Sequence, residues 1–216
     1  MRFIDRTDAG RQLAAKLAER YEGKEGVVYA LPRGGVVLGV EIARRLRMPL
    51  DLIIARKIGH PHNAEYAVGA VTEEGEIVRS PYEVGNIPEE WFAHQAAAER
   101  EEARRRHQLY VGGRPLLSAA GKTAILVDDG IATGLTMEAA IRGLRLQEPK
   151  RIVVAVPVVP SDTAAKLARE IDEVVAVDIA RDYLGAVGAY YDDFPQISDE
   201  QVVALLQAAQ ASTPIN

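Results

Sequence analysis

The sequence Ile125-Leu-Val-Asp-Asp-Gly-Ile-Ala-Thr-Gly134 decides how this chain folds and where a ligand binds. The residues 123–127 predict a buried strand that ends at two adjacent acidic residues. Gly130 and Gly134 allow a tight turn that presents backbone N–H groups inward. The residues 136–146 then show helical spacing. A strand, a glycine-rich turn and a helix in this order predict an anion site, because the positive end of the helix adds to the turn amides.

Strands and helices alternate on both sides of this stretch. Short apolar runs predict strands at 27–31, 50–55, 123–127, 151–156 and 173–177. Apolar residues with a period of 3.6 predict helices at 8–21, 36–46, 89–107, 136–146, 161–170 and 198–209. A hairpin is predicted at 66–71 and 76–79, and a polar loop at 56–63. The alternation predicts an α/β fold with a mostly parallel central sheet flanked by helices.

The size of the chain predicts a single domain. With 216 residues, of which 48% are hydrophobic, it can bury a sizeable core, and we expect one domain over residues 1–216. The segment of about 80–112 contains the charged helix 89–107, and we interpret it as a helical insertion. Ser161 and the pattern Ser198-Asp-Glu-Gln201 are predicted to cap the helices that they begin.

Charge and residue types exclude several classes of function. The chain has 26 basic and 31 acidic residues, a formal net charge of −5, which argues against a dedicated nucleic-acid-binding protein. The absence of cysteine excludes disulfides, thiolate metal sites and cysteine nucleophiles. No apolar run approaches the roughly 18 residues needed to cross a bilayer, and no apolar signal region follows the first residues. We therefore expect a cytoplasmic protein without a membrane partner.

Asp128 and Asp129 need a partner other than the anion, because like charges would repel it. A vicinal diol meets this need, since each carboxylate can accept a hydrogen bond from one hydroxyl. Thr133 and Thr136 can add hydroxyl donors to the turn amides. A sugar phosphate would satisfy both halves of such a site.

Other glycine-rich turns are alternatives. The Gly-Lys-Ser/Thr ending of a Walker loop is absent, and the glycine spacing differs from that of the dinucleotide-binding fingerprint. A purely structural turn with surface aspartates stays open as the simplest alternative.

The stretch Val127-Asp-Asp-Gly-Ile-Ala-Thr-Gly-Leu-Thr136 resembles the motif that binds 5-phosphoribosyl-1-pyrophosphate (PRPP) in type I phosphoribosyltransferases. The similarity covers the whole motif, from the apolar strand residues through the two acids to the phosphate turn. It implies the Rossmann-like fold of that family from about residue 27 to residue 177. The residues that it assigns to the 5′-phosphate are Gly130, Ile131, Ala132, Thr133, Gly134 and Thr136.

The same resemblance assigns the pyrophosphate of PRPP to two segments after earlier strands. Leu31-Pro-Arg-Gly-Gly35 stands where the family grips pyrophosphate through backbone amides, and Arg56-Lys57 stands where a basic residue contacts it. Independently of the family, cations at this place would stabilise the charge that builds on a departing pyrophosphate. A structural turn and a solvated basic pair are the respective alternatives. The implied pyrophosphate-binding residues are Arg33, Gly34, Gly35, Arg56 and Lys57.

Two further features follow from the resemblance. The segment from Ile58 to Glu65 corresponds to a mobile loop that closes over the reaction and excludes water. A small C-terminal hood, at about 180–216, would hold the acceptor base. The aromatic residues of this hood that could stack on the base are Tyr183, Tyr190, Tyr191 and Phe194. The alternative is that these residues only pack in the core.

The function that the resemblance implies is transfer of the 5-phosphoribosyl group from PRPP to a purine or pyrimidine base in nucleotide salvage, with release of pyrophosphate. Mg2+ is the implied cofactor, bound through the substrate with help from Asp128 and Asp129. A homodimer would fit the family. The competing hypotheses are a PRPP- or nucleotide-binding regulatory module without turnover and, ranked last, a sugar-phosphate hydrolase, whose Asp-x-Asp spacing is missing. The expected catalytic residues are Asp128, Asp129, Lys57 and Arg33.

Overall fold

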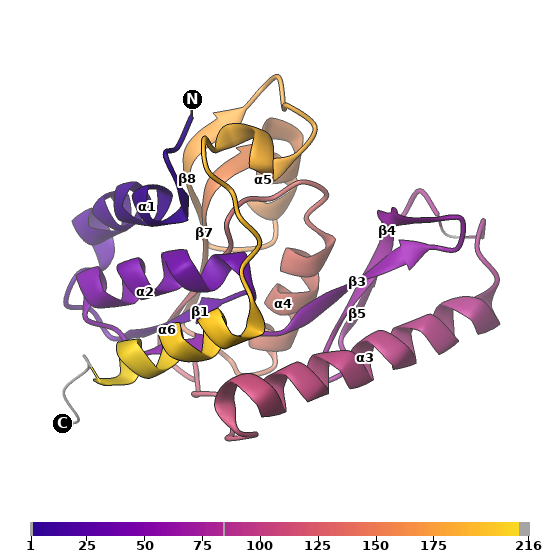
Figure 1. The fold of residues 1–216 in the computed structure, drawn as a ribbon, viewed down its shortest axis with the longest axis horizontal. Coiled ribbons are helices and arrows are strands. Elements are labelled where there is room, and N and C mark those ends of the chain that lie inside the picture. Colours follow the sequence, from indigo (N-terminus) through magenta and orange to yellow (C-terminus); the bar gives the residue numbers. More distant parts are fainter. Residues whose placement is uncertain (1, 84, 212–216) are drawn as a thin grey trace.

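The structure, a computed structural model, describes residues 2–83 and 85–211. A five-stranded parallel sheet forms its centre, in the order β2-β1-β6-β7-β8 (Figure 1). These strands are β1 (Gly26–Ala30), β2 (Leu50–Leu52), β6 (Thr123–Val127), β7 (Arg151–Pro160) and β8 (Glu173–Ala180). The predicted α/β class, with a mostly parallel sheet flanked by helices, is confirmed.

Helices cover both faces of this sheet. The helices on one face are α1 (Arg6–Tyr21), α2 (Gly34–Leu46) and α6 (Asp199–Ala211), and those on the other are α4 (Leu135–Arg145) and α5 (Ser161–Leu167). Alternate residues of a strand point to opposite faces. Val28 and Ile125 accordingly pack with the first group of helices, whereas Val27 and Leu126 pack with the second. Burial on both faces explains why the strands read as continuous apolar runs rather than as alternating ones.

A second, three-stranded antiparallel sheet extends from the core, in the order β3-β4-β5. Its strands are β3 (Ala55–His60), β4 (Asn63–Thr72) and β5 (Ile77–Arg79). The predicted hairpin is therefore confirmed, with a longer first arm. Two other expectations were wrong: the strand 50–55 ends at Leu52, and the polar loop 56–63 is mostly the strand β3 and the turn after it.

The short connection between the two sheets explains this error. Ile53 N donates to Ala30 O at 3.1 Å in the parallel sheet, and Glu73 N donates to Ile54 O at 3.2 Å beside the second sheet. Ile53 and Ile54 are both buried, so the apolar run continues while the chain changes sheets. Hydrophobicity alone cannot show such a break, because both sides of it lie in the core.

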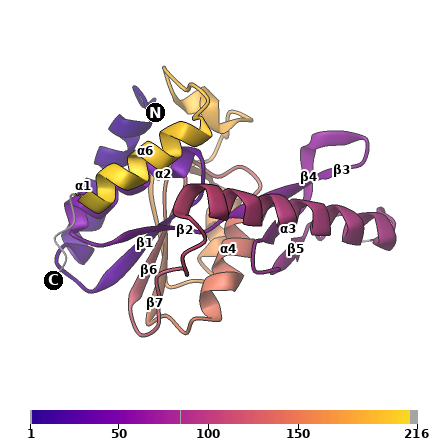
Figure 2. The same cartoon turned by 60° about the horizontal axis from the view of Figure 1, so that its bottom comes forward.

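The long helix α3 (Glu89–Val111) runs along the second sheet (Figure 2). Phe92 and Ala96 pack against Ile58, Val68 and Val71 of that sheet. As the charged sequence 89–107 predicts, most of α3 is solvated, but one narrow face is buried. That this segment is an insertion stays a prediction.

The ends of the later elements differ in detail from those expected. The strand β7 continues to Pro160, and α5 ends at Leu167; Ser161 makes no side-chain cap, because Pro160 takes the capping position. The cap of α6 is confirmed: Ser198 Oγ accepts from Gln201 N at 3.2 Å, and Gln201 Oε1 accepts from Ser198 N at 2.8 Å. The predicted hood reaches to residue 216, and its residues 212–216 lie outside the described part. Over residues 2–83 and 85–211, no helix is both long and apolar enough to cross a membrane.

A buried acid fixes the second sheet against α3. The side chain of Glu73, just after β4, approaches His107 of α3, with 3.4 Å between Oε2 and Nδ1. Burial raises the pKa of Glu73 to about 7, and the charges of Glu74 and Asp51 add to this shift. Burial also lowers the pKa of His107. Both shifts favour the neutral forms of the two side chains.

We expect Glu73→Gln to raise the Tm at pH 8 by a few degrees and to leave it nearly unchanged at pH 4.5. The parent protein loses stability as the pH rises from about 4.5 to about 7, because the unfolded chain releases the Glu73 proton first. Partial solvation of the site limits the size of the effect. Glu76→Gln in the same turn is the control, and thermal melts at the two pH values measure both. A lower Tm of Glu73→Gln at pH 8 would contradict the assignment.

Candidate functional site

The parallel sheet changes its winding direction between β1 and β6. The helix after β1 (α2) lies on one face of the sheet, and the helix after β6 (α4) lies on the other. The two connecting loops therefore diverge and leave a crevice beyond the carboxyl ends of the strands, where open α/β sheets bind ligands. Both loops were identified in the sequence, as 31–35 and 128–134.

These two loops touch each other closely. Leu31 N donates to Val127 O at 2.9 Å, and the Pro32–Arg33 peptide bond is cis. A Cβ atom on Gly35 would lie 2.8 Å from Val127 O and 3.0 Å from Asp128 Cα, so only glycine fits here. The close approach holds the first loop directly beside the acidic residues.

The turn after β6 leaves a run of backbone N–H groups without protein acceptors. Ile131 N donates to Val158 O at 2.9 Å and anchors the start of the turn. From Ala132 to Met137, no acceptor among the described residues meets the backbone N–H groups. Gly134 has a φ of 80° and precedes α4, so the later groups of this run are the first amides of that helix. Such a run favours an anion.

The predicted phosphate residues line one cavity of about 170 Å³. Lys57 of β3 and Asp128 lie in the same wall, and Val187 of the C-terminal segment closes it. The structure thus brings a basic and an acidic side chain to the glycine-rich turn. The predicted residues that it brings together here are Lys57, Asp128, Gly130, Ile131, Ala132, Thr133, Gly134 and Thr136.

The two acids of the motif have different surroundings. Asp128 lines the cavity, and its Oδ1 accepts from Asp129 N at 2.8 Å. The Asp129 carboxylate accepts instead from Arg6 Nε of α1 at 2.8 Å. Burial raises the pKa of Asp128 well above its usual range, and the neighbouring Asp129 charge adds to this. Burial also raises the pKa of Asp129, although the Arg6 guanidinium opposes the shift.

The predicted basic residues have different partners as well. Arg56 Nη2 lies 2.7 Å from Glu99 Oε2 of α3, whereas its neighbour Lys57 lines the phosphate cavity. The two side chains separate because they are adjacent on a strand. Arg33 Nη1 lies 3.7 Å from Asp199 Oδ1.

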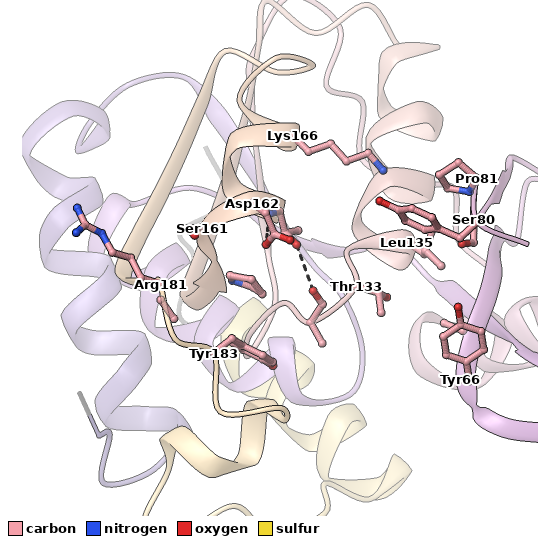
Figure 3. Close-up of a pocket in the computed structure, with 16 residues that line it drawn as sticks. Tyr66, Ser80, Pro81, Thr133, Leu135, Ser161, Asp162, Lys166, Arg181 and Tyr183 are labelled. Atoms are coloured by element: carbon pink, nitrogen blue, oxygen red, sulfur yellow. Dashed lines mark hydrogen bonds between the residues drawn. The ribbon is translucent and has the colours of Figure 1, made fainter.

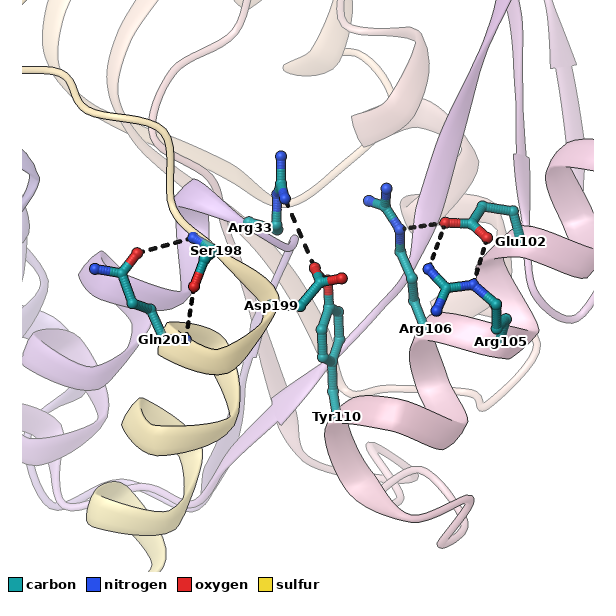
Figure 4. A network of polar contacts seen from close by, with 8 residues as sticks. All are labelled: Arg33, Glu102, Arg105, Arg106, Tyr110, Ser198, Asp199 and Gln201. Atoms are coloured by element: carbon teal, nitrogen blue, oxygen red, sulfur yellow. Dashed lines mark hydrogen bonds and ion pairs between the residues drawn. The ribbon is translucent and has the colours of Figure 1, made fainter.

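Figure 4 shows the contact of Arg33 with the start of α6. Asp199 also accepts from the hydroxyl of Tyr110 of α3 at 2.6 Å. The loop after β1 is therefore tied to both α3 and α6. Gly34 and Gly35 complete this loop as the first residues of α2.

Of the four aromatic residues predicted to contact a base, two are buried packing residues. Tyr190 stacks on Tyr183 at 5.5 Å between ring centroids, and the Tyr191 hydroxyl donates to Asp129 O at 2.6 Å. Phe194 lies beneath the Arg6 guanidinium, 3.6 Å from its ring centroid. Tyr183 differs from the others, because it lines a larger cavity and its buried hydroxyl has no hydrogen-bond partner among the described residues. Burial raises the pKa of Tyr183 to about 12.

That larger cavity, of about 720 Å³, adjoins the phosphate turn through Ala132, Thr133 and Leu135. Figure 3 shows Thr133 between Tyr183, from the C-terminal segment, and Tyr66, from the second sheet. Its other lining groups come mainly from α5 and the segment after β5. The cavity therefore lies between the central sheet and the arm formed by the second sheet.

Two site residues gave no signal in the sequence. Arg6 lies near the amino end, and Asp199 was read only as part of a helix cap. Both act through partners that are far away along the chain, so no local pattern marks them. Arginine is common near the start of a helix, so Arg6 by itself does not indicate a site.

A crevice at the switch point, with turn amides that meet no acceptor in the described part of the chain, a lysine and a carboxylate, is typical of α/β proteins that bind phosphorylated ligands. The chain belongs to the phosphoribosyl transferase domain family, whose model matches residues 5–194. The resemblance noted in the motif is confirmed by this match.

Individual relatives agree with the family. A Mycobacterium tuberculosis H37Rv protein named "Putative phosphoribosyl transferase" is 41% identical over 209 residues, which cover 96% of this chain and 47% of that protein. This chain thus spans about half the length of the curated relatives it matches. The crystal structure of TT1426 from Thermus thermophilus has 44% identity and a TM-score of 0.79, and the match covers 96% of this chain and 99% of that one.

A more distant structure shows the fold alone. A hypothetical protein from Neisseria gonorrhoeae with bound ppGpp has 13% identity and a TM-score of 0.50, with coverage of 96% of this chain and 98% of that one.

Proposed function

We propose that this chain transfers the 5-phosphoribosyl group of PRPP to a nitrogenous base and releases pyrophosphate. The observation that carries the proposal is the run of amides from Ala132 to Thr136 that meet no acceptor among the described residues, in a cavity shared with Lys57 and Asp128. A 5′-phosphate would accept hydrogen bonds from these amides, and Asp128 would accept one from a ribose hydroxyl. Membership of the family supports PRPP as the ligand.

The pyrophosphate end of PRPP would extend toward the loop 31–35 and Lys57. The bond between C1 and the pyrophosphate oxygen breaks as the bond from the acceptor nitrogen to C1 forms, and the proton that this nitrogen carried is released to water. Negative charge grows on the leaving oxygen, and the cations Lys57 and Arg33 would stabilise it. For this, Arg33 exchanges its 3.7 Å contact with Asp199 for the substrate. Holding both reactants in place provides the remaining rate enhancement.

Magnesium fits this donor set. Asp128 faces the cavity, whereas the carboxylate of Asp129 is engaged by Arg6, so the protein offers one acid rather than two. Mg2+ is commonly held by one or two carboxylates together with substrate phosphates and water. When bound, it would neutralise part of the pyrophosphate charge. Asp128 is the residue that would help to hold it.

The acceptor would occupy the cavity of about 720 Å³ beside the turn. Tyr183 can stack on a ring there, and its hydroxyl lacks a partner in the described part of the chain. We infer that the segment after β8, together with α6, forms the hood of the site. The hairpin β3–β4 takes the place of the closing loop predicted at 58–65. Tyr190 and Tyr191 support this hood by packing rather than by touching the base.

The test is PRPP consumption and pyrophosphate release with Mg2+ and each nucleobase in turn. Turnover with one base establishes the transferase and names its acceptor. Binding of PRPP without turnover with any base would favour the regulatory module instead. A protein that does not bind PRPP at all would refute both proposals.

We expect Lys57→Met to weaken pyrophosphate binding by about tenfold, because a cation near the leaving group is lost. The loss should be smaller at high salt, because salt screens the attraction between the lysine and pyrophosphate. Arg56→Met is the matched control, since the adjacent side chain pairs with Glu99 instead. It should lower the Tm and leave pyrophosphate affinity unchanged. Calorimetric titration of the two variants measures the difference, and equal losses of affinity would contradict the assignment of Lys57.

A further inference from the structure

Arg6 connects three parts of the chain at the acidic motif. Its Nε donates to Asp129 Oδ2 at 2.8 Å, and its Nη1 donates to Pro195 O at 2.7 Å. The guanidinium also covers the ring of Phe194. The Arg6 side chain is only 9% exposed, and that of Asp129 is 16% exposed. A buried, charge-assisted hydrogen bond of this kind fixes the orientation of the carboxylate.

The backbone of Asp129 is held as firmly as its side chain. Tyr191 donates its hydroxyl to Asp129 O, and the ring of Tyr191 packs against Phe3 at 5.3 Å between centroids. Phe3 N in turn donates to Tyr190 O at 2.8 Å. Segments from both ends of the chain thus surround Asp129 on the side away from the phosphate cavity, whose lining includes Asp128 but not Asp129.

The Asp129 carboxylate also touches the loop after β1. A Cβ atom on Gly34 would overlap Asp129 Oδ2 and would lie 2.9 Å from Arg6 Nε. Gly34 belongs to the loop that we assign to pyrophosphate. The loop after β1 therefore packs directly against the pair Arg6–Asp129.

We propose that Arg6 is a positioning residue that turns Asp129 away from the ribose and against the pyrophosphate loop, so that Asp128 alone among the two acids meets the sugar hydroxyls. This inference rests on the proposed function, because it concerns the same substrate. The inference gives different roles to Asp128 and Asp129, which the sequence motif does not distinguish. Asp129 acts through the loop, and Asp128 acts on the ligand.

The first experiment separates sugar recognition from phosphate binding. Ribose 5-phosphate and inorganic phosphate are titrated calorimetrically into the full chain and into Asp128→Asn and Asp129→Asn. The ratio of the two affinities reports the contribution of the sugar. We expect Asp128→Asn to lower this ratio by about tenfold or more and Asp129→Asn to keep it within about twofold.

The second experiment tests the positioning role with pyrophosphate as the probe. Arg6→Met and Asp129→Asn should each weaken pyrophosphate binding by about tenfold, and the double variant should lose no more than either single variant. Arg6→Lys keeps the charge but not the forked geometry, so it should recover only part of the affinity. The double variant also removes the unpaired acid that Arg6→Met leaves buried, and it should fold more stably than that single variant.

The outcomes separate this inference from the proposed function. A chain that binds ribose 5-phosphate no better than inorganic phosphate would refute the proposed function and this inference with it. A second outcome would overturn this inference and leave the proposed function intact. In it, the parent chain prefers ribose 5-phosphate to inorganic phosphate, but the ratio of the two affinities falls as far in Asp129→Asn as in Asp128→Asn. Additive losses of pyrophosphate affinity in the double variant would also overturn it. If Arg6→Met does not fold, Asp129→Asn and Arg6→Lys still give both measurements.

Discussion

Replacing Asp128 with asparagine is expected to weaken binding of ribose 5-phosphate by about 10- to 100-fold, because a hydrogen bond to a charged group is lost. The same substitution is expected to raise the Tm. Asparagine has the same shape and can still accept from Asp129 N, so the turn geometry should persist. A residue whose loss stabilises the protein and removes binding is kept for function rather than for folding.

The gain in stability follows from the direction of the pKa shift. Burial and the Asp129 charge raise the pKa of Asp128 above its unfolded value. As the pH rises above about 4, the unfolded chain releases this proton first, and the folded state loses stability relative to it. Asparagine has no such proton. Its advantage in Tm should therefore be small near pH 4 and should grow toward neutral pH.

Thermal melts from pH 4 to pH 8 and titrations with ribose 5-phosphate measure the two effects. Asp182→Asn is the control, because this exposed aspartate lies in the C-terminal segment and outside both cavities. It should change neither the affinity nor the pH dependence. A variant Asp128→Asn that binds ribose 5-phosphate like the parent would remove Asp128 from the site.

Gly34→Ala should produce the second large effect, with loss of pyrophosphate binding by at least about tenfold and a Tm lowered by several degrees. The added methyl would overlap the Asp129 carboxylate and approach its Cγ at 2.6 Å. Either the loop or the carboxylate must then move. Movement of the loop displaces the amides assigned to pyrophosphate, and movement of the carboxylate breaks its hydrogen bond to Arg6.

Gly143→Ala provides the matched control for this substitution. Gly143 lies within α4, and a Cβ atom there would meet only Thr72 Cγ2, at 3.9 Å. Alanine favours helix over glycine, so this variant should be more stable by roughly 0.5–1 kcal/mol and should bind pyrophosphate normally. Titration and thermal melts compare the two variants. Unchanged pyrophosphate affinity in Gly34→Ala would show that the loop does not bind it.

Much of the site could be predicted because its signals are local. The strand at 123–127 was predicted with its correct bounds, and the glycine-rich turn predicted after it lines a cavity. The hairpin β3–β4 was missed because the residues 56–63, which form most of β3 and the turn after it, are mostly polar, and because the pairing has a register shift at Gly59. As a result, the sequence predicted the same role for Arg56 and Lys57, although their side chains lie on opposite faces of β3.

The sequence by itself determined the parallel sheet, the order of its helices and the glycine-rich turn, because apolar periodicity and glycine act on neighbouring residues. Only the tertiary structure decided which acid lines the cavity at the glycine-rich turn. Asp128 and Asp129 are adjacent and chemically alike, and the choice between them depends on Arg6, which lies 123 positions away along the chain. Long-range packing decides such contacts, because only the folded chain brings the Arg6 guanidinium within hydrogen-bond distance of the Asp129 carboxylate.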